Sequence, residues 1–160
     1  MSLERFHRAQ ASNWSGFAMA LNEIQRGRKS SHWIWYVFPQ IDGLGRSGTA
    51  QEYALHGLGE AVQYVRDPIL RTRYLEIARG VEEQLARGVT LEHLMGGQTD
   101  ALKLVSSLTL FRAAAEQTVA TESDPAFGQL AQVINSLLQQ TAVQGYPPCE
   151  LTLNRITATK

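Results

Sequence analysis

Helical periodicity runs through most of this chain, and it constrains the fold more than any other feature of the sequence. Apolar residues recur at three- and four-residue spacing between Phe17 and Ile24, and again between Ile69 and Leu85. This spacing places apolar side chains on one face of a helix, which buries that face in a core. We therefore expect a mainly α fold.

Start and stop signals delimit the expected helices. Asp67-Pro68 and Asp124-Pro125 each supply an aspartate for the N-cap and a proline for the first helical position. Asp100 is expected to cap a further helix that continues through the alanines at 113–115. These signals predict a compact single domain over residues 1–160, a bundle of about six or seven helices. The last ~10 residues, with strand-like content, are expected to form a loosely packed tail.

An aromatic segment at residues 30–48 interrupts the helical pattern. Its apolar run, from Trp33 to Phe38, has the composition of a short buried strand, but no other segment offers it a convincing partner. We therefore expect irregular structure here. Two interpretations of Trp33, Trp35 and Tyr36 remain open: they stack on a planar ligand, or they pack into the core, as we expect for at least one tryptophan.

Composition excludes several classes of protein. The chain has 160 residues, of which 44% are hydrophobic and 19% charged, so it can bury a core and is too apolar to be disordered. Its apolar runs are shorter than the roughly 20 residues that cross a bilayer, and its charged N-terminus does not resemble a signal peptide. We expect a cytoplasmic protein without a membrane partner. The net charge of zero argues against nucleic acid as a partner, and the single cysteine, Cys149, excludes an internal disulfide.

Basic residues and glycines flank the aromatic segment. The cluster of Arg26, Arg28 and Lys29 is either a solvated helix end, where cations favour the helix dipole, or a small anion site. The glycines at 43, 45 and 48 have G-x-G-x-x-G spacing, but the strand–helix–strand pattern of a dinucleotide-binding fold is lacking. Two alternatives remain: Arg46 and Ser47 hold an anion, or Ser47 caps a helix.

Three residues are candidates for catalysis. His32 is suited to acid–base chemistry or to a structural role beside tryptophan. Asp100 and Lys103 share one polar face of the expected helix with Ser107, and they are either part of a site or a surface ion pair. Because the histidines lack the spacing of zinc ligands, we expect no metal, and no cofactor is indicated.

Four motifs cover much of the chain: L-x-R-F-x-x-A-Q at 3–10, G-R-K-x-S-H-W-x-W-Y-x-F-P-Q at 27–40, G-L-G-x-S at 43–47 and L-K-L-x-S-S-x-T-L-F at 102–111. With Tyr53, they resemble a bacterial family of unknown function whose members often carry the label calpastatin and which has a mycobacterial structural prototype. The resemblance implies a mainly α fold and no established activity. The chain departs from the family pattern near its end, where relatives tend to carry G-x-x-D and Gly145 is followed by residues 147–150, PPCE.

Two functions follow from these features, beside a third interpretation in which the motifs only pack the fold. In the first, the aromatic segment, the glycine turn and the 102–111 helix form a pocket for a small anionic, nucleotide-like ligand, with hydrolysis of nucleotides or ADP-ribose derivatives as the activity considered. In the second, the protein is a non-enzymatic adaptor, a monomer or weak homodimer whose aromatic surface binds a protein partner. A concave polar cluster would favour the ligand, and a flat apolar patch the partner. The residues expected to bind the ligand are Lys29, His32, Trp33, Trp35, Gln40, Arg46, Ser47, Tyr53, Lys103 and Ser107.

Overall fold

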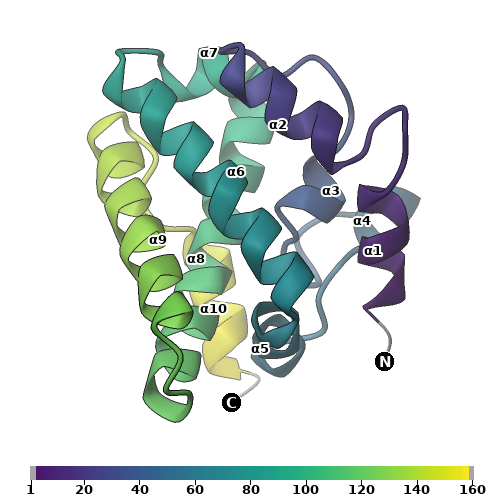
Figure 1. Cartoon of the computed structure of the whole chain (residues 1–160), viewed down its shortest axis with the longest axis vertical. Coiled ribbons are helices and arrows are strands. Elements are labelled where there is room, and N and C mark those ends of the chain that lie inside the picture. The colour runs from purple at the N-terminus through teal and green to yellow at the C-terminus, as the bar shows by residue number, and fades with distance from the viewer. Residues whose placement is uncertain (1–2, 159–160) are drawn as a thin grey trace.

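The computed structural model describes residues 3–158, and within that range the protein is built from ten helices with no strand (Figure 1). The predicted mainly α fold is confirmed. The helix count exceeds the predicted six or seven because several elements are single turns. The helices are α1 (Glu4–Gln10), α2 (Phe17–Gln25), α3 (Ile34–Val37), α4 (Gly48–Glu52), α5 (Leu58–Arg66), α6 (Pro68–Ala86), α7 (Leu91–Met95), α8 (Gln98–Thr121), α9 (Pro125–Val143) and α10 (Glu150–Ala158).

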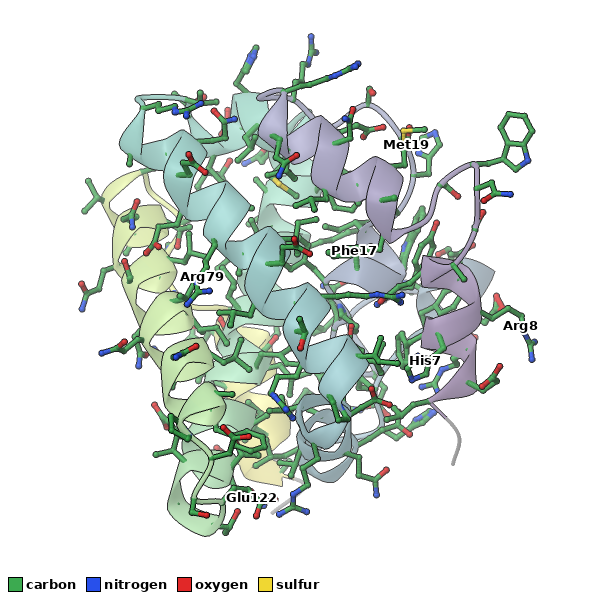
Figure 2. All side chains as sticks on the ribbon, in the orientation of Figure 1. His7, Arg8, Phe17, Met19, Arg79 and Glu122 are labelled. Carbon is green, nitrogen blue, oxygen red and sulfur yellow. The ribbon has the colours of Figure 1, made fainter. Side chains whose placement is uncertain are left out.

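Helix α8 is the centre of the bundle. It packs against α5, α7, α9 and α10, while α6 packs against α2 and α9 and lies in front of α8 in the view of Figure 1. Buried residues occur on nearly every side of α8, including the hydroxyl side chains of Ser106, Ser107 and Thr109. A helix that is apolar around most of its circumference is a buried one. Side chains fill the space between the helices (Figure 2).

The local start signals are confirmed at two helices and wrong at a third. Asp67 accepts hydrogen bonds from the backbone of Ile69 and Leu70, and Asp124 accepts one from Ala126. The helix expected to begin at Asp100 begins instead at Gln98, after a glycine at φ 143°. The Asp100 side chain is thereby left to bind other groups.

The aromatic segment is mostly irregular, as expected, with α3 as its one helical turn. The apolar run is not a strand, although Ile41 forms an isolated parallel bridge with Leu55. In that bridge the Asp42 amide donates to the Leu55 carbonyl at 2.8 Å, and the Leu55 amide donates to the Gln40 carbonyl at 2.9 Å. The bridge holds the loop after α3 against the loop before α5.

Most of the segment expected to be a loosely packed tail is helical, and its residues 159–160 lie outside the described range. Residues 150–158 form α10, which packs on α8. Thr152 and Ile156, four residues apart, are the buried positions of α10, and the Thr152 hydroxyl lies 2.9 Å from that of Ser106. Across residues 3–158, no helix is both long and apolar enough to span a membrane.

Candidate functional site

A cavity of about 690 Å³ opens beside the first half of α8. Its walls come from the N-terminal turns of α8, from α7, from the start of α10, and from the loop between α9 and α10. We call it the α8 cavity. Its lining residues are Gln40, Leu44, Glu92, Gln98, Leu102, Lys103, Val105, Ser106, Gln144, Gly145, Tyr146, Pro147, Pro148, Cys149, Glu150 and Leu151.

Lys103 is the cation in the wall of the α8 cavity. Its ammonium nitrogen lies 4.8 Å from the centre of the Trp35 ring and 3.9 Å from Oδ1 of Asp100. The side chain is 27% exposed. An ammonium group over an indole face gains a cation–π attraction, and the two neighbours together restrict where the Lys103 head can lie. Trp35 therefore positions Lys103, because the ammonium group covers its ring.

A second lysine, Lys29, forms a closer ion pair with Asp100 than Lys103 does. Nζ of Lys29 lies 2.7 Å from Oδ2 of Asp100 and 5.0 Å from the centre of the Trp33 ring. The Lys29 side chain is only 5% exposed, so this is a nearly buried ion pair. The fold has brought Lys29 to the polar start of α8, while Arg26 and Arg28 of the same basic cluster are exposed. One carboxylate faces two ammonium groups, and the charge of Lys103 is only partly balanced.

Glu23, which the sequence did not single out, fixes the loop that carries Lys29. Oε1 accepts hydrogen bonds from the amides of Ser30 and Ser31, at 2.8 and 2.9 Å, and from the Trp33 indole, at 2.9 Å. The Ser31 hydroxyl donates to Oε2. Burial alone would raise the pKa of Glu23, but these hydrogen bonds outweigh it and lower the pKa to about 2.

The loop between α9 and α10 forms a fixed wall of the cavity. The Tyr146 hydroxyl donates to Oε1 of Glu92, and the Gln144 carboxamide oxygen accepts from the Leu91 amide at 2.8 Å. The Cys149 amide donates to the Thr109 hydroxyl at 2.9 Å. Burial and the neighbouring Glu92 carboxylate raise the pKa of Tyr146 to about 12, so its hydroxyl remains a donor at neutral pH.

Three of the residues predicted to bind the ligand are packed elsewhere. Trp33 has no exposed surface and belongs to the core. Ser107 is also fully buried, with its hydroxyl 3.0 Å from that of Tyr74. Tyr53 packs its ring against Phe6 and Tyr36, at centroid distances of 6.0 and 5.1 Å.

His32, Arg46 and Ser47 also lie outside the α8 cavity, to which the glycine turn contributes Leu44. His32 and Arg46 are exposed and line neither this cavity nor the neighbouring hollow. Ser47 caps α4 by accepting the Ala50 amide at 3.0 Å, which is the simpler of its two expected roles. Of the predicted residues, Gln40 and Lys103 line the cavity. Trp35 and Asp100 contact Lys103, and Lys29 pairs with Asp100.

A smaller hollow of about 340 Å³ adjoins the cavity at Gln40. Within it, the Asp42 carboxylate is 3.0 Å from a guanidinium nitrogen of Arg155 and 3.6 Å from Nδ1 of His56. Gly43, at φ 90°, leaves room for the Arg155 guanidinium, which lies 2.9 Å from where a Cβ would stand. Within residues 3–158, no three His, Cys, Asp or Glu side chains are grouped as metal ligands.

The chain belongs to the DUF1810 family of proteins of unknown function, whose model matches residues 1–132. It is also similar to the crystal structure of the conserved hypothetical protein Rv1873 from Mycobacterium tuberculosis. The two share 36% sequence identity and a TM-score of 0.66 over 80% of this chain and 83% of that one. No curated protein matches the chain. The expected family of unknown function and its mycobacterial relative are thus supported, whereas nothing in these comparisons carries the label calpastatin.

Proposed function

We propose that this protein binds a small, nucleotide-like ligand in the α8 cavity, with an anionic group of the ligand paired to Lys103. The observation that carries the proposal is that Lys29 and Lys103 share one carboxylate, that of Asp100. Lys29 lies 2.7 Å from this carboxylate and Lys103 only 3.9 Å, so a cation in the cavity wall is incompletely neutralised. An anion is the natural partner of such a group.

Size and lining support the same proposal. Small-molecule sites typically measure about 300–1,000 Å³ and combine apolar walls with a few polar groups. The α8 cavity, at about 690 Å³, lies within that range. Leu44, Leu102 and Val105 offer apolar surface for a ring, and Gln98 and Gln144 offer amide groups.

The rival function, a protein partner bound by the aromatic segment, has less support. Trp33, Tyr36 and Phe38 are buried, and Lys103 covers the ring of Trp35. The segment therefore presents no flat aromatic patch. The proposal is for binding rather than turnover, because His32 does not line the cavity and the Asp100 carboxylate lies between two ammonium groups.

Replacing Lys103 with methionine is expected to abolish ligand-induced stabilisation. The test is a thermal-shift screen of the wild-type protein with AMP, NAD, ADP-ribose and sugar phosphates. A ligand at 100 times its Kd adds about 2.7 kcal/mol, which raises the Tm of a domain of this size by roughly 5–10 °C. In Lys103→Met the shift should fall to near zero, since the apolar variant keeps the length of the side chain but not its charge.

Arg79→Met is the matched control. Arg79 is exposed on α6, which contributes no residue to the cavity wall (Figure 2). This variant should keep the full shift. If no compound in the panel stabilises the wild-type protein, or if Lys103→Met responds as the wild type does, the proposed function is wrong.

A further inference from the structure

The charges around the α8 cavity restrict the ligand more closely than its volume does. Three of the lining residues carry charge at neutral pH: Lys103 on α8, Glu92 on α7 and Glu150 on α10. The wall thus holds one cation and two carboxylates, and its formal charge is −1. A site that takes a polyphosphate would instead gather several cations, because each phosphate adds negative charge that must be balanced.

Glu92 is exposed, and its carboxylate is anchored on one side. The Tyr146 hydroxyl donates to one of its two oxygens, and Tyr146 is itself 6% exposed. Beside it, the Gln144 oxygen is held by the Leu91 amide. A carboxylate held in this way at a cavity wall favours a ligand group that donates a hydrogen bond or carries positive charge.

We infer that the ligand of the α8 cavity carries one anionic group, which pairs with Lys103, and an amino group, which donates to the Glu92 and Glu150 wall, and that the cavity discriminates against polyphosphates. This inference rests on the proposed function and names its ligand class: a small molecule that is anionic at one end and hydrogen-bond-donating at another. A nucleoside monophosphate with an exocyclic amino group is the simplest nucleotide of this kind.

Three probes separate the two parts of the inference by titration calorimetry. AMP carries one phosphate and the 6-amino group, ATP adds two phosphates, and purine riboside 5′-monophosphate lacks only the amino group. We expect ATP to bind at least about fivefold more weakly than AMP at low ionic strength, since its added charges face the carboxylates at close range. The probe without the amino group should bind about tenfold more weakly, as expected for the loss of one hydrogen bond to a charged acceptor.

A double variant tests whether the carboxylates cause the discrimination. Glu92→Gln with Glu150→Gln removes both charges while leaving an acceptor for the Tyr146 hydroxyl, and it should bring the affinities of ATP and AMP to within about twofold. The control, Glu76→Gln with Glu83→Gln on α6, removes the same charge away from the cavity wall and should keep the wild-type ratio. Circular dichroism melts establish that both variants are folded.

The outcomes distinguish this inference from the proposed function. If ATP binds as tightly as AMP and both need Lys103, the function stands and the inference is overturned. The inference is also overturned if the double variant keeps the wild-type ratio of AMP to ATP affinity. It is overturned too if the probe without the amino group binds as tightly as AMP. If none of the three probes binds, the proposed function fails for nucleotides, and the inference fails with it.

Discussion

Replacing Glu23 with alanine is expected to lower the free energy of unfolding by about 3 kcal/mol. The variant leaves four donors without the carboxylate: the amides of Ser30 and Ser31, the Ser31 hydroxyl and the fully buried indole of Trp33. Hydrogen bonds to a charged group contribute about 1.5–3 kcal/mol each, and unpaired buried donors carry a further penalty. Urea denaturation measures the change, with Glu76→Ala on the exposed face of α6 as a control that should change it by less than about 0.5 kcal/mol.

The pH dependence of stability provides a second test of Glu23. Its pKa is lowered in the folded protein from 4.5 to about 2, so the unfolded state binds more protons between these values. The stabilisation by Glu23 is therefore fully present above pH 4.5 and is lost as the pH falls toward 2. The difference in unfolding free energy between the wild type and Glu23→Gln should narrow over that interval. A difference that stays constant down to pH 2 would contradict the role of the carboxylate.

Asp100→Asn is expected to cost about 3 kcal/mol of stability, because it leaves the ammonium group of Lys29 nearly buried without a counter-charge. The Lys29 side chain is 5% exposed and that of Asp100 24%, so leaving the lysine unpaired costs more stability than leaving the aspartate unpaired. Lys29→Met should lower the free energy of unfolding by less, since the remaining Asp100 carboxylate is partly solvated and still has Lys103 3.9 Å away.

The double variant Lys29→Met with Asp100→Asn completes the thermodynamic cycle. Removing both charges should recover most of the stability lost in Asp100→Asn, as replacing a buried ion pair with uncharged groups is often nearly neutral. Denaturant unfolding of the four proteins gives the coupling energy. A coupling below about 0.5 kcal/mol would show that the pair is not the buried interaction described here.

Features encoded within one turn of the chain were predictable. Asp67 and Asp124 cap their helices as the Asp-Pro pairs indicated, because cap and helix are neighbours in sequence. Asp100 failed as a cap because the glycine before Gln98 adopts φ 143°, which lets α8 begin earlier.

Features that depend on distant contacts were not predictable from the same patterns. Glu23 looks like one more polar residue of an amphipathic helix, and its partners Ser30 to Trp33 are reached only through the turn at Gly27. Ser107 shares a helical face with Asp100 in sequence, but Tyr74 of α6 buries it.

Residues 144–151 of the cavity wall could not be predicted from periodicity, since a loop around Pro147 and Pro148 has neither the helical nor the strand period of apolar residues. Lys103 and Asp100 were identified because their spacing on one helix is a local pattern. Their link to Lys29 and Trp35 emerged only from the fold.

The central claim, that the α8 cavity is a ligand site organised by Lys103, is tested most directly by an NMR titration of the ¹⁵N-labelled protein with AMP. We predict saturable shift changes confined to the amides around the α8 cavity, at residues 44, 92, 98–106, 144–146 and 149–151. The changes should be absent in Lys103→Met, and in Arg79→Met they should be as large as in the wild type. Saturable changes centred on the smaller hollow, at Asp42, Gln51 and His56, or an undiminished response in Lys103→Met, would contradict it.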